Sequence, residues 1–495
     1  MYLLGYDLGS SSVKATLLEV STGKCVAATF FPDEEMPILV KQEGWAEQDP
    51  EMWWENLQKA NDKIFAQANI DKSLVKAIGI SYQMHGLVLV DEKQKVLRPA
   101  IIWCDSRAAA IGDAAFQRIG KTHCLERLLN SPGNFTASKL RWVKENEPAI
   151  FEKTHKFLLP GDFIAMKLTG ELNTTISGLS EGIFWDFKKG QLADFLLDEY
   201  GISKDLVPDI VPTFSNQGTL QASAAKKLGL VLGTPITYRA GDQPNNAFSL
   251  NVLQPGEVAA TAGTSGVVYS VSDQVNFDPQ SRVNTFAHVN HGEETRLGIL
   301  LCINGCGILN AWMRKNTGVA GYPEMNNLAS QVPVGSDGLS ILPFGNGAER
   351  VLENQNMNAQ ISGLNFNIHG QGHLFRAAQE GIAFAIYYGM EVMNEMGVNL
   401  SIIRAAEANL FLSPIFRETL ATVSGSEIQL YNTDGGIGAA RGAGLGAGIY
   451  SSPEEAFLQL KVVNRTIPDS KNVAAFQSAY EHWKDVLKKV KKTIL

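Results

Sequence analysis

Apolar and polar residues alternate at the start of the chain in the manner of a β-hairpin. Residues 1–6 are mostly apolar, and in residues 13–20 apolar side chains alternate with Lys14 and Thr16. The segment between them, residues 7–12, is a short polar turn that contains one glycine. Two β-rich runs around such a turn predict a pair of antiparallel strands.

The same pattern returns in the second half of the chain. Residues 257–261 and 267–271 are strand-like, and the loop between them, residues 262–266, again consists of small and hydroxyl-bearing residues. A repeat on the scale of a domain predicts two related lobes that face one ligand.

Strand-like and helical segments alternate along the rest of the chain. This alternation indicates α/β lobes, in which ligands gather at the ends of strands. The predicted boundary divides the chain into an N-terminal lobe, residues 1–248, and a C-terminal lobe, residues 249–495. Helices are expected at residues 50–68, 134–143, 148–168 and 372–397, and strands at residues 74–81, 87–90 and 232–240.

Length and charge narrow the class of protein. A chain of 495 residues is too long for one hydrophobic core, so at least two domains are expected. A net charge of -8 without a basic stripe argues against nucleic-acid binding. The five cysteines form no Cys-x-x-Cys pair, which favours a reducing compartment and no cysteine metal site. We find no cationic leader and no long apolar run, so we expect a cytoplasmic protein without a membrane segment.

Both small-residue loops are candidate phosphate cradles. Glycine and hydroxyl residues leave backbone N–H groups free to point into one concavity, which suits an anion. Asp7 lies at the mouth of the first loop and would repel a bare phosphate, so its carboxylate implies a bridging Mg²⁺. An ordinary capped hairpin is the alternative for the first loop taken alone. The candidate phosphate ligands are Gly9, Ser10 and Ser11 in the first loop and Gly263, Thr264 and Ser265 in the second.

Asp242 is the candidate general base. Phosphoryl transfer to an alcohol needs a carboxylate that orients the hydroxyl and accepts its proton. Asp242 follows a predicted strand and Gly241, so the backbone can turn sharply and present the side chain at a cleft. A strand-end aspartate is more often a turn former or a helix cap, and that alternative stays open at this point.

Two neighbouring strand ends supply a candidate polyol pocket. His85 follows Met84 and is expected to donate a hydrogen bond to a sugar oxygen. Trp103 offers an aromatic face and Asp105 a polar group, which together suit the two sides of a sugar. A lone histidine is usually structural, so this assignment depends on the combination.

A segment of small residues, 434–444, joins a glycine turn to a helix. Close packing of that helix against a neighbour is the favoured interpretation, and direct contact with a ligand is the alternative.

A series of short motifs resembles the FGGY family of carbohydrate kinases, and the Met-His-Gly run is most similar to the xylulose kinases within it. The resemblance covers essentially the full length of the chain, with the motifs in order. They lie at residues 6–14, 45–50, 83–86, 103–107, 135–143, 158–162, 241–242 and 263–266.

The resemblance implies an actin-like, ribonuclease-H-like α/β fold whose two lobes close over ATP, Mg²⁺ and a ketose. The implied reaction converts ATP and D-xylulose into ADP and D-xylulose 5-phosphate, and a homodimer is the assembly that the family suggests. Asp242 matches the catalytic base, Asp7 the group that serves metal and phosphates, and Met84 and His85 the sugar contacts. Further candidate ligands at the corresponding positions are Gln243 at the sugar and Lys14, Glu407 and Asn409 at the nucleotide.

The chain departs from the family pattern in four places. Residues 405–409 lack the glycines expected beside adenosine, and their Cβ atoms limit how closely a base can approach. Gln243 replaces the usual Asn. Residues 174–178 lack the acid of an expected Ser-Asp pattern, and residues 344–350 keep Glu-Arg with an extra residue and no Thr-Pro. These changes bear on substrate and nucleotide preference more than on reaction class.

Two alternatives remain open from the sequence. Another ketose such as ribulose, or a polyol, is the main alternative substrate, because one epimeric hydroxyl changes binding only modestly. A sugar or nucleotide sensor without turnover is the alternative from a different class. The sequence does not fix the epimer, the way adenine is held, the oligomeric state or any regulation.

Overall fold

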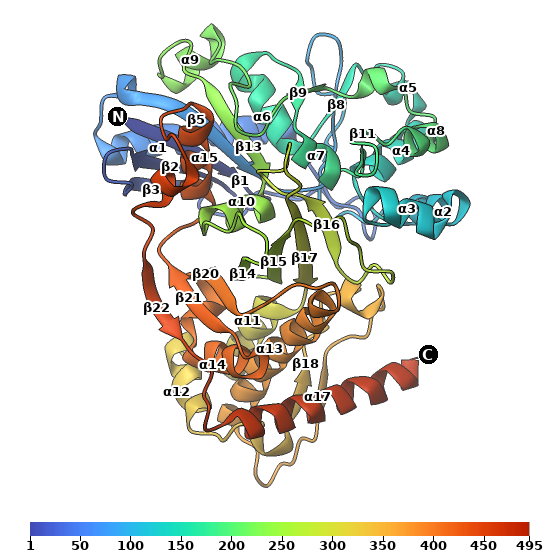
Figure 1. The fold of residues 1–495 in the computed structure, drawn as a ribbon, viewed down its shortest axis with the longest axis vertical. Coiled ribbons are helices and arrows are strands. Elements are labelled where there is room, and N and C mark those ends of the chain that lie inside the picture. Colours follow the sequence, from blue (N-terminus) through green and yellow to red (C-terminus); the bar gives the residue numbers. More distant parts are fainter. Residues whose placement is uncertain (495) are drawn as a thin grey trace.

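The computed structural model describes residues 1–494, which form two lobes stacked along the long axis (Figure 1). The N-terminal lobe is built on a five-stranded sheet with the strand order β13-β5-β1-β2-β3. These strands are β1 (Tyr2–Leu8), β2 (Val13–Glu19), β3 (Cys25–Phe31), β5 (Val75–Tyr82) and β13 (Ile236–Gly241). The first three strands are antiparallel, as the alternating pattern predicts, and β5 and β13 continue the sheet in parallel with β1.

The C-terminal lobe repeats this arrangement. Its sheet has the order β16-β17-β15-β14-β20-β21-β22, so a set of antiparallel strands is again followed by two parallel strands, β20 and β21, and β22 adds an antiparallel edge. The predicted fold of two related α/β lobes is confirmed. The strands are β14 (Val258–Ala262), β15 (Gly266–Ser272), β16 (Asn284–Ala287), β17 (Leu297–Ile303), β20 (Ile402–Ala406), β21 (Glu427–Tyr431) and β22 (Val462–Thr466).

Helices cover both faces of the N-terminal sheet. α1 (Pro50–Ala68) and α6 (Pro160–Thr169) pack on one face, and α10 (Asp242–Ser249) and α15 (Gly435–Gly446) pack on the other. α1 begins where Asp49 accepts a hydrogen bond from the N–H of Glu51 and Pro50 takes the first helical position, as its sequence predicts. In the C-terminal lobe α13 (Gln371–Glu395), the helix predicted over residues 372–397, buries an apolar stripe in the core.

The remaining elements extend the two lobes. The other helices are α2 (Ala109–Ile119), α3 (Lys121–Leu128), α4 (Thr136–Asn146), α5 (Pro148–Phe151), α7 (Ile176–Glu181), α8 (Asp194–Tyr200), α9 (Ala222–Leu228), α11 (Cys306–Thr317), α12 (Tyr322–Ser330), α14 (Pro414–Ser424), α16 (Pro453–Phe457) and α17 (Val473–Ile494). The short strands are β4 (Glu47–Gln48), β6 (Val88–Val90), β7 (Ala100–Ile101), β8 (Lys156–Leu158), β9 (Asn173–Thr174), β10 (Trp185–Asp186), β11 (Gln191–Leu192), β12 (Asp209–Ile210), β18 (Ser340–Leu342) and β19 (Gln360–Ser362). No helix within residues 1–494 combines the length and apolar character needed to cross a bilayer.

The prediction of one helix over residues 148–168 is wrong. α5 ends at Phe151, β8 pairs with β6, and α6 begins at Pro160. A proline can start a helix but cannot continue one, because it lacks the N–H that the preceding turn needs. The buried side chains of Phe157 and Leu158 therefore fill a strand between two separate helices.

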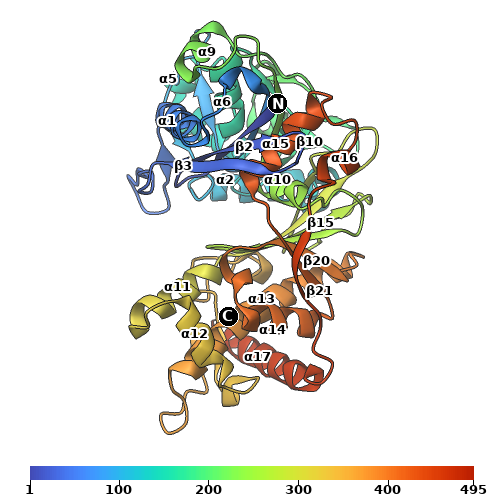
Figure 2. The same ribbon diagram turned by 90° about the vertical axis from the view of Figure 1, so that its left-hand side faces the viewer.

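The predicted lobe boundary does not account for α15 and α16. The chain crosses between the lobes after α10, but α15 and α16 return to the N-terminal lobe before β22 rejoins the C-terminal sheet (Figure 2). A Cβ atom on Gly79 of β5 would lie 2.0 Å from the carbonyl oxygen of Ala439, and one on Gly442 would lie 2.4 Å from the ring of Tyr238. Close packing of the small-residue helix is therefore confirmed.

Candidate active site

The first small-residue loop follows β1 and is held by one hydrogen bond of its own and by side chains from two other segments. The N–H of Gly9 donates to the carbonyl of Ser12 at 3.0 Å, which closes the turn. Gln48 Nε2 donates to the carbonyl of Ser10 at 2.7 Å, and Trp103 Nε1 lies 3.5 Å from the hydroxyl of Ser10. The Trp103 ring is half exposed at this place, as expected for a wall of the cleft.

Asp7 lies at the end of β1, partly exposed, opposite Lys14 of β2. One carboxylate oxygen accepts a hydrogen bond from the hydroxyl of Ser81 at 2.9 Å. Burial raises the pKa of Asp7, and the charge of Lys14 and the Ser81 hydrogen bond oppose that shift. The other oxygen lies against Gly435, where α15 begins.

These groups fit a Mg²⁺ ion. Mg²⁺ prefers one or two carboxylates combined with phosphate oxygens and water, and Asp7 presents one partly exposed carboxylate beside the loop of Ser10 and Ser11. The negative charge of Asp434 adds to the field at Asp7, so a cation there would relieve a repulsion between neighbouring carboxylates.

The second small-residue loop lies over the start of α11. Its carbonyls accept hydrogen bonds from the helix: Gly307 N–H donates to Gly263 at 3.0 Å and Ile308 N–H donates to Thr264 at 3.3 Å. A Cβ atom on Gly307 would lie 2.0 Å from the Gly263 oxygen, so only glycine allows this approach. Asn409 Nδ2 lies against Gly263, 3.6 Å from the place of a Cβ atom on that glycine.

Asp242 begins α10 directly after β13 and stands between the two loops. Its side chain is partly exposed. Burial, followed by the charge of Asp7, raises the pKa of Asp242 to about 7. On its other side the charge of Asp242 also acts on Cys302, whose thiol lies beside the hydroxyl of Ser265 in the second loop. Asp7, Asp242 and the pair of Cys302 and Ser265 therefore lie near one another, although they come from both lobes.

Gln243 contacts the candidate base directly. Its Nε2 donates a hydrogen bond to Asp242 Oδ2 at 3.1 Å. The amide thus orients the carboxylate that the sequence marks as the base. Met84 is buried at the end of β5 and packs on Gly241, where a Cβ atom would lie 2.6 Å from Met84 Cγ.

His85 differs from the prediction in its hydrogen-bonding role. Nδ1 lies 2.9 Å from the main-chain carbonyl of Glu181, which can only accept, so Nδ1 carries the proton. Burial, together with the nearby charge of Lys139, lowers the pKa of His85 to about 3. The ring is therefore neutral, and Nε2 can accept a hydrogen bond from a sugar hydroxyl but cannot donate one.

The sequence did not reveal the wall that encloses His85. The ring packs edge-on against Phe135 with centroids 4.9 Å apart, and against Phe286 of β16 at 5.5 Å. Arg350 places its guanidinium 5.7 Å from the Phe135 centroid. Phe286 and Arg350 belong to the C-terminal lobe. No local pattern marks Phe286, and the Glu-Arg run that contains Arg350 does not show that the fold brings it to the end of β5.

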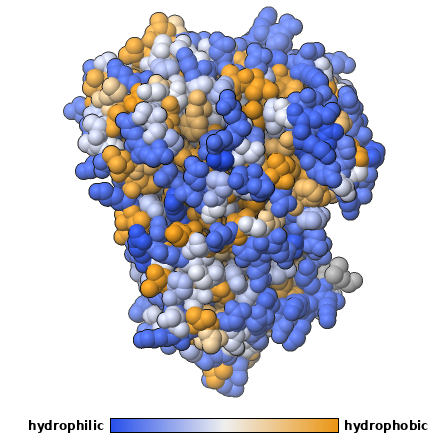
Figure 3. All heavy atoms as spheres, viewed as in Figure 1, coloured by the Kyte–Doolittle hydropathy of each residue, from blue (hydrophilic) through white to orange (hydrophobic). Residues whose placement is uncertain are grey.

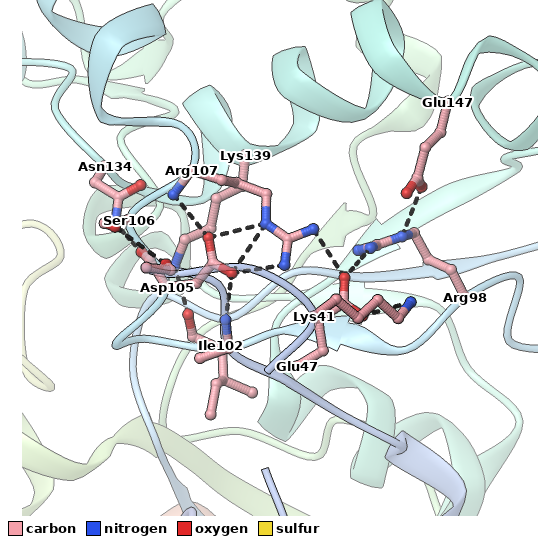
Figure 4. A network of polar contacts seen from close by, with 12 residues as sticks. Lys41, Glu47, Arg98, Ile102, Asp105, Ser106, Arg107, Asn134, Lys139 and Glu147 are labelled. Carbon is pink, nitrogen blue, oxygen red and sulfur yellow. Dashed lines mark hydrogen bonds and ion pairs between the residues drawn. The ribbon is translucent and has the colours of Figure 1, made fainter. Parts of the chain in front are cut away.

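Asp105 lies in a buried charge network (Figure 4). Arg107 donates to Asp105 from Nε and Nη2, and the N–H of Ala46 donates to it at 2.6 Å. These contacts occupy the carboxylate, so Asp105 supports the site from behind in this structure. Arg107 also bonds to Glu47 at 2.8 Å and lies over the Trp45 ring at 3.8 Å.

Lys139 is fully buried next to this network and holds the two strand ends together. Its Nζ donates to the carbonyls of His85 and Ile102, each at 2.9 Å. Burial lowers the pKa of Lys139 to about 8. The loops that carry His85 and Trp103 thus share one cationic anchor.

Residues 405–409, which are expected beside adenosine, lie at the end of β20 and contain no glycine. Glu407 follows β20, and its N–H donates to the carbonyl of Tyr431 at 2.9 Å. Glu407 and Asn409 are both exposed, next to the second loop, and Asn409 adopts a left-handed backbone conformation with φ 54°. The whole molecule is narrower at the junction of the two lobes, as the space-filling view shows (Figure 3).

Comparison with known proteins agrees with this geometry. A profile described as the FGGY family of carbohydrate kinases, N-terminal domain, matches residues 2–249, and its C-terminal counterpart matches residues 258–443. The xylulose kinase of Escherichia coli (strain K12) is 32% identical over 97% of each chain. That of Bacillus subtilis (strain 168) is 27% identical over 98% of this chain and 96% of its own.

A solved structure shares the whole architecture. The structure titled as a xyloylose kinase from Brucella ovis superposes with a TM-score of 0.90 over 100% of both chains, at 25% identity. The two profiles together span most of the sequence. The chain belongs to the FGGY family of carbohydrate kinases.

Proposed function

We propose that this protein phosphorylates a ketopentose with ATP, and that its substrate is D-xylulose, which it converts to D-xylulose 5-phosphate. The observation that carries the proposal is the position of Asp242, a carboxylate with a pKa raised to about 7 between two loops from opposite lobes. Xylulose kinases at 27% to 32% identity over nearly the whole chain support the choice of sugar.

In this proposal Asp242 is the general base. The acceptor hydroxyl of the sugar donates a hydrogen bond to Asp242, attacks the γ-phosphorus of ATP and gives up its proton to the carboxylate as ADP leaves. A base with a pKa near the working pH is half ionised there, which balances availability against proton affinity. Gln243 holds the carboxylate in place through its amide.

The two loops share the triphosphate. Gly9, Ser10 and Ser11 approach it from the N-terminal lobe, and Gly263, Thr264 and Ser265 from the C-terminal lobe. Asp7 would hold Mg²⁺, which neutralises charge on the phosphate oxygens. Lys14 adds a positive charge at the first loop, and Glu407 and Asn409 lie on the nucleoside side.

The sugar lies between Asp242 and the end of β5. His85 Nε2 accepts a hydrogen bond from one hydroxyl, Met84 contacts the carbon chain, and the exposed face of Trp103 covers the C–H side. Phe286 and Arg350 complete the pocket from the other lobe.

Release of ADP tests the proposal. The purified protein is incubated with ATP, Mg²⁺ and one acceptor at a time: D-xylulose, D-ribulose, L-ribulose, D-fructose, D-gluconate or glycerol. We expect the highest kcat/KM with D-xylulose. A higher value with any other acceptor would refute the substrate, and binding of sugar and ATP without ADP release would refute the activity.

A further inference from the structure

Glu181, the last residue of α7, is a buried acid that the proposed reaction does not use. It is 2% exposed, and neither carboxyl oxygen has a partner in full hydrogen-bond geometry among residues 1–494, with the hydroxyl of Tyr82 as the polar group beside them. Burying an unpartnered polar group is costly, so such a group calls for a reason. Glu181 also lies one turn beyond residues 174–178, where the family resemblance leads one to expect an acid that is missing.

The carboxyl of Glu181 packs directly behind the candidate base. A Cβ atom on Gly241 would lie 2.7 Å from Glu181 Oε2 and 2.6 Å from Met84 Cγ. Glu181 therefore fills the space that Gly241 leaves open, one residue before Asp242. A side chain at position 241 would displace the carboxyl, and removal of the carboxyl would leave a void under the end of β13.

The main chain of Glu181 holds the ring of His85, the proposed contact to the sugar. The carbonyl of Glu181 accepts the hydrogen bond of His85 Nδ1 at 2.9 Å. This bond fixes the tautomer in which His85 Nε2 faces the pocket without a proton. One residue thus contacts the strand end that carries Asp242, the side chain of Met84 and the ring of His85.

The surroundings of the carboxyl favour its neutral form. Burial, followed by the charge of Asp242, raises the pKa of Glu181 well above its ordinary value. The hydroxyl of Tyr82 lies beside it, and the other acid near it, Asp162, is paired with Arg239 at 2.9 Å. The nearest cationic side chains, those of Lys139 and Arg239, are bonded to other groups.

We propose that Glu181 is a positioning residue of the phosphoryl-transfer site, where its buried carboxyl supports the strand end before Asp242 and its main-chain carbonyl holds the His85 ring. The proposal rests on the proposed function. As long as Glu181 is neutral, it keeps the Asp242 strand end and the His85 ring in place. When it ionises at high pH, a second negative charge appears next to Asp242 and the arrangement is disturbed.

Two variants of Glu181 separate the effect of its charge from the effect of the volume that it fills. Glu181→Gln keeps the size and the neutral charge, so near neutral pH we expect its kcat within about threefold of the wild type. At high pH, where the wild type loses activity as Glu181 ionises, this variant should keep it. Glu181→Ala leaves a void behind Asp242, and we expect a fall in kcat of at least about tenfold, since small misplacements of a reacting group are costly.

A control distinguishes this role from a purely structural one. Glu380 is also buried, but it lies on α13 and is paired with Arg376 at 2.7 Å, away from the cleft. Glu380→Gln should lower the melting temperature and leave the shape of the pH profile unchanged. Glu181→Gln should change the shape of the pH profile without lowering the melting temperature. A kcat as low in Glu181→Gln as in Glu181→Ala would overturn the proposal.

A spectroscopic readout needs neither sugar nor turnover, so it stands if Glu181→Ala does not fold. The infrared band of a protonated carboxylic acid, recorded near neutral pH, should lose intensity in the difference spectrum between wild type and Glu181→Gln. An unchanged band would show that Glu181 is ionised and would refute the proposal. Failure of the proposed function would instead show as absent turnover with the difference band present.

Discussion

The chemistry of this protein concentrates in two carboxylates that approach each other from different strands. Asp7 ends β1 and Asp242 follows β13, and burial together with the charge of Asp7 raises the pKa of Asp242. Like charges in a shared cleft favour protonation of one of them. In the proposed function Asp7 holds the cation and Asp242 takes the proton.

The pH dependence follows from this pair. Asp242 acts as a base only when it is ionised, so we expect kcat/KM for the sugar to fall below about pH 7 by about tenfold per pH unit. The rate is measured across a series of buffers at constant ionic strength. A profile that stays level down to about pH 5 would mean that an ordinary carboxyl, with a pKa of about 4, or no base at all, limits the reaction.

The same burial gives a stability prediction. The folded pKa of Asp242 is raised, so its neutral form is favoured and the free energy of unfolding falls as pH rises from about 4, where the unfolded side chain ionises, to about 7. Asp242→Asn removes this loss. We expect the variant to be more stable by about 1–2 kcal/mol at about pH 8, a value reduced for the partial exposure of the side chain.

Urea unfolding at about pH 5 and about pH 8 checks this expectation. The gain from Asp242→Asn should be larger at the higher pH. A variant less stable than the wild type at both values would show that the Asp242 charge is compensated in the folded protein.

At the residue scale the sequence identified charged groups but not their hydrogen bonds. Asp7 and Asp242 could be singled out because Asp7 lies at the mouth of the first small-residue loop and Asp242 follows a predicted strand and Gly241. The role of His85 was reversed, because its tautomer depends on the carbonyl of Glu181, far along the chain. Asp105 was assigned to the sugar because nothing local announces that Arg107 and Ala46 occupy its oxygens.

Among the elements, α15 connects the two lobes most closely. It follows β21 of the C-terminal sheet but packs on β1, β5 and β13, with its first residue against the Asp7 carboxylate. Helix N-termini favour nearby negative charge, so α15 adds to the stabilisation of an ionised Asp7. The contact between α15 and the N-terminal sheet requires small residues on both elements, such as Gly442 of α15 and Gly79 of β5.

We expect Gly442→Val to destabilise the N-terminal lobe by at least about 3 kcal/mol, since its side chain would overlap the Tyr238 ring and cannot be accommodated without moving the helix. Gly370→Ala is the matched control, because a Cβ atom there meets no neighbour within 4 Å and its φ is -116°. Thermal unfolding of both variants decides the matter. Equal melting temperatures would mean that the α15 contact is not close-packed in solution.

Elements with strong periodicity were predictable, and elements set by long-range contacts were not. The hairpins around both loops and the apolar stripe of α13 follow from local patterns. The return of α15 to the first lobe does not follow from a local pattern. Its small residues predict a close contact but do not specify which element it packs against. The break of the predicted helix over residues 148–168 depends on Pro160 and on the pairing of β8 with β6.

The whole molecule is a pair of duplicated lobes joined by three crossings of the chain. The crossings lie between α10 and β14, between β21 and α15, and between α16 and β22 (Figure 2). Short connections of this kind act as hinges when packed lobes move as bodies. The sequence predicted the duplication from its repeated loop, whereas the crossings after β21 became visible only with the fold.

Closure of the lobes around the sugar is the expected motion. A closed cleft excludes water, which would otherwise compete with the sugar for the phosphoryl group. Small-angle scattering with and without D-xylulose and a non-hydrolysable ATP analogue should show a smaller radius of gyration in the loaded protein. An identical radius in both states would contradict closure.

The central claim is that Asp242 takes the proton from a sugar hydroxyl while both loops hold one ATP. The most direct test measures ADP formation from ATP and D-xylulose by the wild type and by Asp242→Asn, together with the Kd of each for ATP. We predict a kcat at least about 10²-fold lower in the variant, the usual cost of losing a general base, with an unchanged Kd for ATP. Equal turnover by the two proteins would contradict the account.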